Sequence, residues 1–380
     1  MESADVVVIG GGIAGCSAAW FLARAGLDVL VLERDGLAEH ASGAAAGMLT
    51  PFAEGAPGSA LLARGREALS QLEALCEELH ARSGVDPEFE RSGSLRVALS
   101  DAEQADLQGR FARLQGTGVD VEWLAPAEAA LLQPGLAPEL RGALWAREES
   151  HVRSPLMTRA YAGAAQSLGA RLVTGSVVVG LCFEGDRVSG VRVAGALEGT
   201  ISAGCVVACA GTWSGVLREW LAPRAIADRL PPVEPLRGQI LSLRGAAPLL
   251  RTIVWGEDAY LVPKRDGSVV VGATEERAGF DARVTASGLA QLLAAAPRAL
   301  PALADAAFDR GWAGLRPSSP DGLPSIGTLP GIEQLVIAYG HHRSGVLLSP
   351  ISGALVRDRV LGKEPAPGSE AFDPARFSPR

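Results

Sequence analysis

The sequence predicts an α/β protein whose N-terminal part is a Rossmann-type dinucleotide-binding domain. Three observations carry this prediction. An apolar run at 6–9 leads into glycines that match G-x-G-x-x-G, from Gly10 to Gly15. An apolar-faced helix follows, and a second apolar run at 29–32 ends on Glu33. Strand, glycine turn, helix, strand and acid in this order form the βαβ unit that binds dinucleotides.

Each residue type in this unit has a physical reason. Gly10 permits the tight turn, Gly12 lets the backbone approach a pyrophosphate, and Gly15 lets helix and strand pack closely. The helix N-terminus offers unpaired N–H groups to phosphates, and Glu33 can accept hydrogen bonds from a ribose hydroxyl. The run 6–23 carries no charge and is long enough for a membrane span. The glycines in its middle favour the soluble βαβ unit, so no membrane association is expected.

Length and composition narrow the class further. A chain of 380 residues exceeds what one hydrophobic core usually organises, so two domains are expected. The net charge of −8 comes without a basic stripe, which argues against nucleic-acid binding. The five cysteines show no metal-ligand spacing, so no metal site is expected and the thiols are interpreted as buried. An odd cysteine count without a signal peptide predicts a reducing cytoplasm.

Periodicity and turn residues predict the elements that follow the βαβ unit. Residues 41–51 form a small-residue segment directly behind it. Helices are expected at about 60–82, 101–114, 126–132, 154–169 and 285–300. Strands are expected at 94–99, 206–208, 335–339 and within 233–274, with a hairpin over 177–193. A helix of about 15 residues is expected after 340–345, so that the last strand–glycine–helix unit repeats the order of the first.

Five stretches together resemble the D-amino-acid oxidase superfamily of amino-acid-oxidising flavoproteins. They are GGGIAG with Glu33, ASGAAAGMLTP (41–51), CAGTWS (209–214), WAGLRPSSPDGLPSIG (312–327) and GHHRSGVLLSP (340–350). The first is shared by many FAD and NAD proteins, and the fourth also occurs in D-amino-acid dehydrogenases. The second and fifth are more specific. Over nearly its whole length the chain most resembles the glycine oxidases of thiamine biosynthesis.

This resemblance implies a cofactor and a domain plan. The cofactor would be non-covalent FAD, because no cysteine follows Cys209 and the C-terminal cysteine linkage of monomeric sarcosine oxidases has no counterpart. The chain would pass twice between a Rossmann-type FAD-binding domain and a smaller α+β substrate domain built on a mostly antiparallel sheet. The FAD-binding domain would comprise 1–82, 146–220 and 308–380, and the substrate domain 83–145 and 221–307.

The resemblance also implies which residues would bind FAD. Ile13, Ala14, Glu33 and Arg34 would hold its ADP half, and Val177 would contact the adenine end through its backbone. Residues 341–347 would lie along the flavin ring and ribityl chain, where the N-terminus of the last helix can stabilise the anionic reduced flavin. The full set is Gly10, Gly12, Ile13, Ala14, Gly15, Glu33, Arg34, Ala41, Ser42, Ala46, Gly47, Met48, Val177, Gly211, His341, His342, Arg343, Ser344, Gly345, Val346 and Leu347.

Three further residues are candidates for substrate binding. Arg316 and Arg343 would meet the substrate carboxylate, which a guanidinium matches in a planar, bidentate way, and Tyr260 would add a hydroxyl. The alternatives are an Arg316 that holds a structural acid such as Asp321, an Arg343 that contacts flavin more than substrate, and a Tyr260 that only packs in its strand. Oxidation of an amine by hydride transfer requires no histidine base.

Two departures from the glycine-oxidase pattern concern substrate preference. Ser344 stands where many members have Asn. Glu275 and Glu276 follow Gly272-Ala273-Thr274, where some members place a Met that shapes the active site. An acid at this point either discourages anionic or bulky side chains or points to solvent.

The expected function is FAD-dependent oxidative deamination of glycine and other small amines, including sarcosine and small D-amino acids. The imine would hydrolyse to glyoxylate and ammonia, and O2 would be reduced to H2O2, in a homo-oligomer that serves thiamine (thiazole) biosynthesis. One alternative is a quinone-linked D-amino-acid dehydrogenase, which predicts membrane association and little reaction with oxygen. The other is a non-catalytic flavin-binding subunit, against which the two arginines argue.

Overall fold

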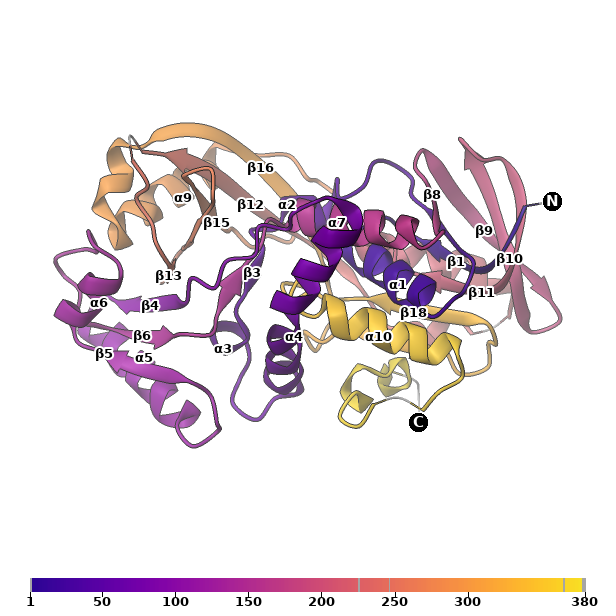
Figure 1. Ribbon diagram of the computed structural model, residues 1–380, viewed down its shortest axis with the longest axis horizontal. Coiled ribbons are helices and arrows are strands. Elements are labelled where there is room, and N and C mark those ends of the chain that lie inside the picture. The colour runs from indigo at the N-terminus through magenta and orange to yellow at the C-terminus, as the bar shows by residue number, and fades with distance from the viewer. Residues whose placement is uncertain (1, 225, 246, 365, 378–380) are drawn as a thin grey trace.

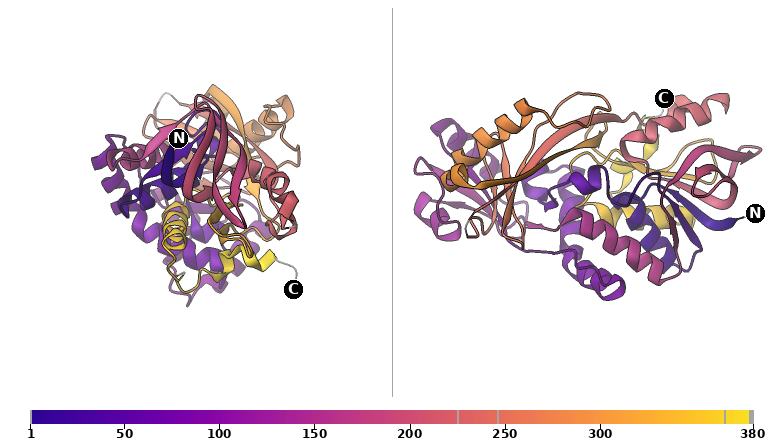
Figure 2. Two further views of the ribbon diagram at one scale, coloured as in Figure 1. Left: turned by 90° about the vertical axis from the view of Figure 1, so that its right-hand side faces the viewer. Right: turned by 90° about the horizontal axis from the view of Figure 1, so that it is seen from above.

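The first of two large β-sheets carries the glycine motif at the end of its strand β1. The computed structural model describes residues 2–224, 226–245, 247–364 and 366–377, and the molecule is elongated with one sheet toward each end (Figures 1 and 2). Along the first sheet the strands are β17 (Ser325–Thr328), β18 (Leu335–Tyr339), β11 (Gly199–Ala208), β1 (Ser3–Ile9), β2 (Val29–Leu32) and β8 (Arg171–Val173). These six run parallel except β17. Two more strands complete the sheet: β10 (Arg187–Gly195) pairs antiparallel with β11, and β9 (Ser176–Glu184) pairs antiparallel with β10.

Both faces of this sheet are covered, which explains why its strands read as continuous apolar runs. Val6 and Val8 pack toward α1 (Ile13–Arg24), α4 (Ala60–Ser83), α7 (Ser154–Ser167) and α10 (Ser349–Val360). Val7 and Ile9 point to the other face, which is covered by the hairpin β9 (Ser176–Glu184)–β10 (Arg187–Gly195) and α8 (Leu217–Leu221). The predicted Rossmann-type βαβ unit and the hairpin are confirmed.

The second sheet is almost entirely antiparallel. Its strands are, in order, β16 (Ala307–Ser318), β12 (Glu234–Arg244), β15 (Ser268–Gly272), β14 (Tyr260–Pro263), β13 (Ile253–Trp255), β4 (Ser94–Ala98), β6 (Gly142–Ala146) and β5 (Val121–Leu124). Only β13 and β4 pair in parallel. Helices α6 (Pro126–Leu132) and α9 (Ala286–Ala299) pack on one face, and α5 (Asp101–Leu114) lies beside β4, β5 and β6. The predicted α/β fold with a mostly antiparallel second sheet is confirmed.

Short elements connect the two sheets. Helices α2 (Ala41–Ala44) and α3 (Pro51–Glu54) lie between them, and β3 (Met48–Leu49) pairs with β7 (Ser150–His151) (Figure 1). Six 3-10 helices complete the described chain: Gly211–Val216, Ala222–Arg224, Ala227–Arg229, Pro301–Asp305, Glu370–Phe372 and Pro374–Phe377. Within the described ranges, no helix combines the length and apolar character needed to cross a bilayer.

Three sequence expectations need correction. β16 pairs with β12 along its length, so residues 308–318 belong to the second sheet and not with the first. β17 lies inside 318–330, a stretch whose Pro and Gly residues predict a loop and not a strand. The last helix begins at Ser349, and residues 341–348 form turns before it, so it does not start directly after Gly345. The first two errors share a cause, because pairing with a distant strand is not visible in local periodicity.

Helices α1 and α10 pack so closely that only glycine fits at position 353. A Cβ there would lie 2.5 Å from Cδ2 of Phe21 and would also collide with the Ser17 hydroxyl. We predict that Gly353→Ala lowers the free energy of unfolding by about 1–3 kcal/mol through overpacking. In an exposed helix, by contrast, alanine is more favourable than glycine by about 1 kcal/mol. Gly109→Ala in α5, whose nearest neighbour would be 3.5 Å away, should be neutral or stabilising. Thermal and urea unfolding of both variants test this, and equal stabilisation of both would contradict it.

Candidate functional site

Three adjoining cavities form a channel from the carboxyl ends of the first sheet to the space between the sheets. The outer cavity, of about 270 Å³, is bordered by the β1–α1 turn and the end of β2. The middle cavity, of about 100 Å³, shares Gly12, Ala41 and Ser42 with it. The inner cavity, of about 80 Å³, shares Ala41, His342 and Arg343 with the middle one. This elongated shape suits a long ligand that lies across the sheet edge.

The β1–α1 turn shapes the outer cavity with backbone alone. Gly10 has φ +108°, and a Cβ on it would lie 2.5 Å from the carbonyl oxygen of Cys209. Glu33 ends β2 and is only 7% exposed. Its Oε2 accepts a hydrogen bond from Gly11 N at 2.5 Å and its Oε1 from Asp35 N at 2.8 Å. Two main-chain donors therefore hold the carboxylate at the cavity wall, where a ribose is expected.

An aromatic side chain closes the other side of the outer cavity. Trp213 lies 4.6 Å below the Arg34 guanidinium and 4.5 Å from the His40 ring, measured to ring centroids. The Thr212 hydroxyl also borders this cavity, is buried, and has no hydrogen-bond partner within the described part of the chain. A glycine turn, a held acid, flat walls and an unpaired hydroxyl together fit the adenosine and phosphate half of FAD.

Most residues predicted to bind FAD line the channel. The outer cavity holds Gly10, Gly12, Glu33, Arg34, Ala41, Ser42, Val177 and Gly211. The middle cavity adds Ile13, Ala14, His341, His342, Arg343, Gly345 and Val346. The inner cavity adds Ala46, Gly47 and Met48. Gly15, Ser344 and Leu347 line none of the three: Gly15 packs against the Gly10 carbonyl, and the other two are buried behind the wall. Lining the channel is what the structure shows, and direct roles in FAD binding stay predictions for the whole set.

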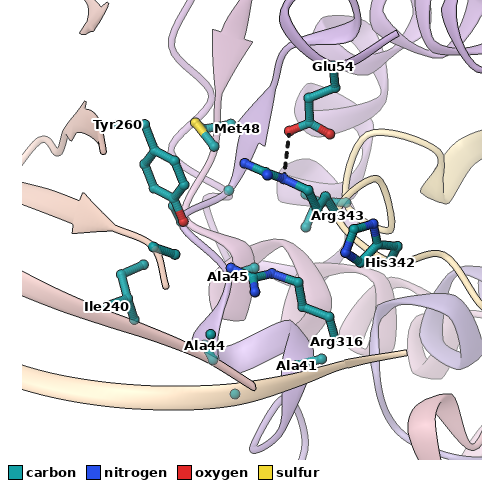
Figure 3. A pocket seen from close by; sticks show the side chains of 16 residues that line it. Ala41, Ala44, Ala45, Met48, Glu54, Ile240, Tyr260, Arg316, His342 and Arg343 are labelled. Carbon is teal, nitrogen blue, oxygen red and sulfur yellow. Dashed lines mark ion pairs between the residues drawn. The ribbon is translucent and has the colours of Figure 1, made fainter. Parts of the chain in front are cut away.

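The inner cavity brings together the three candidates for substrate binding. Tyr260 comes from β14, Arg316 from β16, and Arg343 from the turns after β18. In Figure 3 both guanidinium groups point toward the space beside the Tyr260 hydroxyl. Tyr260 and Arg316 are more than 50 positions apart in the sequence, and Arg316 and Arg343 are 27 apart. They come together because the end of β16 forms a bridge with the turns after β18, between Ser318 and His341.

Of the two arginines that line the inner cavity, Arg316 is less engaged by acidic side chains than Arg343. Its Nη1 donates to the carbonyl of Thr274 at 3.1 Å, and none of the described carboxylates lies within ion-pairing distance of it. The alternative in which Arg316 holds Asp321 is wrong, because Asp321 pairs with Arg376 at 2.7 Å. A Cβ on Gly238 of β12 would lie 2.5 Å from Arg316 Cζ. The guanidinium therefore rests against bare backbone.

Tyr260 is both packed and directed into the cavity. Its side chain is buried, and its ring makes an edge contact with Trp255 at 5.4 Å between centroids. Burial raises the pKa of the Tyr260 hydroxyl, so the phenol stays protonated and can donate a hydrogen bond.

The two histidines of the fifth motif are neutral near pH 7. Burial lowers the pKa of His341 to about 4, and its Nε2 lies 2.9 Å from the Ser352 hydroxyl. Burial also lowers the pKa of His342, whose Nε2 lies 3.6 Å from Oε2 of Glu275. Neither side chain adds a positive charge to the channel.

Sequence reasoning missed Glu54, the last residue of α3. It is the only acid that lines the inner cavity among the described residues, and its side chain is 14% exposed. Its Oε1 lies 3.9 Å from Nε of Arg343, as the dashed line in Figure 3 shows. Burial raises the pKa of Glu54, against the influence of Arg343 and Arg316. One signal was available: Glu54 is the only charged residue between His40 and Arg64.

Helix α3 is held at both ends by buried charged side chains. Glu149 accepts hydrogen bonds from Phe52 N at 2.8 Å and Ala53 N at 2.9 Å, and the Ser94 hydroxyl donates to its other oxygen. Arg110 donates to the carbonyls of Ala53 at 3.0 Å and Gly55 at 3.2 Å. Burial raises the pKa of Glu149 to about 7. This frame determines where the Glu54 carboxylate lies.

The acids at 275 and 276 do not line the inner cavity. Glu276 pairs with Arg237 at 2.5 Å and accepts a hydrogen bond from the Gln239 amide at 2.8 Å. Glu275 is half exposed and faces His342. The cavity lining therefore does not support the interpretation in which these acids act directly on the side chain of the substrate.

Comparisons with known proteins agree on one family. The family described as DAO, FAD dependent oxidoreductase, matches residues 5–359. Glycine oxidase of Geobacillus kaustophilus is 35% identical over 98% of this chain and 96% of its own, and the crystal structure of glycine oxidase from this organism superposes with a TM-score of 0.92 over 99% of both chains.

Two further relatives widen the comparison. The bifunctional protein ThiO/ThiG of Synechocystis is 33% identical over 99% of this chain, which spans about half of that protein (54%). The crystal structure of iminodiacetate oxidase from Chelativorans sp. BNC1 has 30% identity and a TM-score of 0.85, covering 97% of this chain and 98% of its own.

The position of Glu33 yields a prediction for cofactor affinity. In Glu33→Gln an amide NH2 replaces one of the two oxygens that accept main-chain N–H groups, so one donor faces another. We expect the Kd for FAD to rise about 10- to 100-fold, the usual worth of a hydrogen bond to a charged group. Titration of the apoprotein with FAD, followed by flavin fluorescence, measures this. Glu78→Gln on the surface of α4 is the matched control, and equal Kd values for both variants would contradict the prediction.

Proposed function

The chain belongs to the DAO family of FAD-dependent oxidoreductases, and we propose that it oxidises glycine and other small amino acids, including sarcosine and small D-amino acids, with O2. The amine becomes an imine, which water converts to the 2-oxo acid and ammonia, glyoxylate in the case of glycine. O2 takes up the two electrons and becomes H2O2. The observation that carries this proposal is Arg316, a guanidinium that pairs with none of the described carboxylates and lines a small cavity on the FAD channel.

The residues of the inner cavity have separate tasks in this proposal. Arg316 anchors the substrate carboxylate with two parallel hydrogen bonds. Tyr260 donates its hydroxyl proton to the same carboxylate, and Arg343 adds a second positive charge nearby. Bound FAD supplies the two-electron acceptor for a hydride from the substrate Cα. The neutral His341 and His342 border the channel without an acid–base task.

The biological setting is part of the proposal. A relative named as a bifunctional ThiO/ThiG protein supports a role in thiamine (thiazole) biosynthesis, in which the imine would be consumed. All five cysteines are free thiols, which supports a reducing cytoplasmic location. A homo-oligomer is proposed on the resemblance alone.

The test is peroxide release by the FAD-loaded protein in air, with glycine, sarcosine, D-alanine and D-proline compared. We expect peroxide from glycine and sarcosine, because the inner cavity is small. Bleaching of the flavin by D-alanine without peroxide would indicate the quinone-linked dehydrogenase. If none of the four amines bleaches the flavin, the chain is a non-catalytic flavin-binding subunit.

Substitution of Arg316 should lower the catalytic efficiency of the enzyme. We predict that Arg316→Ala lowers kcat/KM for glycine about 10- to 100-fold, because the substrate carboxylate loses its charged hydrogen bonds. Arg316→Lys keeps the charge without the bidentate geometry, so it should recover part of the loss. Steady-state peroxide assays measure both. Unchanged kcat/KM in Arg316→Ala would place the carboxylate elsewhere.

Gly238 offers a test of the anchor's position that leaves every charge in place. A methyl group at 238 would displace the Arg316 guanidinium, so Gly238→Ala should raise KM for glycine about tenfold or more while FAD remains bound. Gly256→Ala is the matched control, because its Cβ would be 3.4 Å from its nearest neighbour, an ordinary contact. Equal KM values in the two variants would show that Arg316 does not hold the substrate.

A further inference from the structure

We propose that Glu54 sets the charge preference of the inner cavity, so that the enzyme accepts amines with one carboxylate and rejects amines with two. This inference rests on the proposed function and specifies its substrate class. Glycine, sarcosine and small D-amino acids fall in the accepted class. Iminodiacetate, which is sarcosine with a second carboxylate on its N-methyl group, falls in the rejected class.

The argument begins with the charges that line the cavity. Arg316 and Arg343 contribute two positive charges, Glu54 contributes one negative charge as the ion-pair partner of Arg343, and His342 is neutral. One bound carboxylate therefore neutralises the cavity. A second carboxylate would leave an uncompensated negative charge in a space of about 80 Å³ that Glu54 lines. An unpaired charge in such a place is costly.

Further charges lie behind the wall of the inner cavity, and Arg96 is one that acts on Glu54. Arg96 is buried and lies 5.1 Å over the Trp255 ring, and burial lowers its pKa to about 10. It stays protonated, and Glu149, Arg343 and Glu54 are among the charged groups that act on it. Arg110 is engaged by the carbonyls at the end of α3. A second carboxylate therefore meets Glu54 at the cavity surface, while Arg96 acts on this site from behind the wall.

Glu54 has little freedom to move away from a second carboxylate. It ends α3, whose N–H groups are held by Glu149 and whose carbonyls are held by Arg110. Arg343 faces it at 3.9 Å. A substrate that displaced Glu54 would have to break this frame or separate the ion pair in a largely buried site.

The fold itself permits dianionic amines. The relative named iminodiacetate oxidase shares this fold over nearly the whole chain, so the architecture does not exclude such substrates. The selection proposed for this chain therefore comes from side chains that line the cavity, and Glu54 is the lining side chain with the required charge.

Two ether analogues test the proposal without turnover. Methoxyacetate and oxydiacetate match sarcosine and iminodiacetate, with an ether oxygen in place of the nitrogen, and their binding to the FAD-loaded protein is followed by the change in the flavin absorption spectrum. We expect the wild-type protein to bind methoxyacetate at least about tenfold more tightly than oxydiacetate, because like charges repel in the cavity. Glu54→Gln should lower the ratio of the Kd for oxydiacetate to the Kd for methoxyacetate about tenfold or more.

Two further variants separate charge from structure. Glu54→Asp keeps the carboxylate and should keep the wild-type preference. Glu122→Gln removes an exposed charge on β5 and should leave the ratio unchanged. In turnover, Glu54→Gln should raise kcat/KM for iminodiacetate relative to sarcosine by a similar factor.

Either of two results would overturn the proposal. One is a wild-type protein that binds oxydiacetate as tightly as methoxyacetate, a measurement that requires no variant to fold. The other is a Kd ratio in Glu54→Gln within about twofold of the wild-type ratio, far below the expected electrostatic effect. Failure of the proposed function is distinguishable, because it would abolish flavin bleaching by sarcosine and leave the binding measurements with the ethers intact.

Discussion

Residues 41–55 lie between the two large sheets. Charged side chains hold this segment there through hydrogen bonds to main-chain N–H and carbonyl groups. Lys264 donates to the carbonyls of Ala46 at 2.7 Å and Val152 at 2.9 Å. Glu149 and Arg110 hold the two ends of α3 in the same manner. Because this segment contributes to the outer, middle and inner cavities, these contacts position the whole channel.

Burial of these charged groups costs free energy, and the directions of their pKa shifts show this cost. Burial lowers the pKa of Lys264 to about 7 and raises that of Glu149 to about 7, because each loses hydration without a full opposite charge in exchange. The benefit is geometric, since a hydrogen bond to a carbonyl or N–H places the backbone itself. Weakly polar surroundings would also strengthen the proposed attraction between Arg316 and a substrate carboxylate.

Local patterns predicted the parts of the fold that depend on neighbours in sequence. The β1–α1–β2 unit, the helix α5 and the hairpin β9–β10 follow from periodicity, glycine positions and turn residues that lie within a few positions of one another. The place of β16 does not follow in this way. Its partner β12 is more than 60 residues earlier, and a strand's own pattern does not reveal which sheet it joins.

The sequence by itself determined the cofactor-binding unit and the likeness to FAD-dependent amino-acid oxidases, and it predicted Arg316 and Tyr260, which line the inner cavity, as candidates for substrate binding. Tertiary structure decided which charges share the inner cavity. It placed Glu276 against Arg237, paired Asp321 with Arg376, and brought Glu54 to face Arg343. The physical reason is that charges interact through space, so the partner of a side chain is known only when distant segments have been packed together.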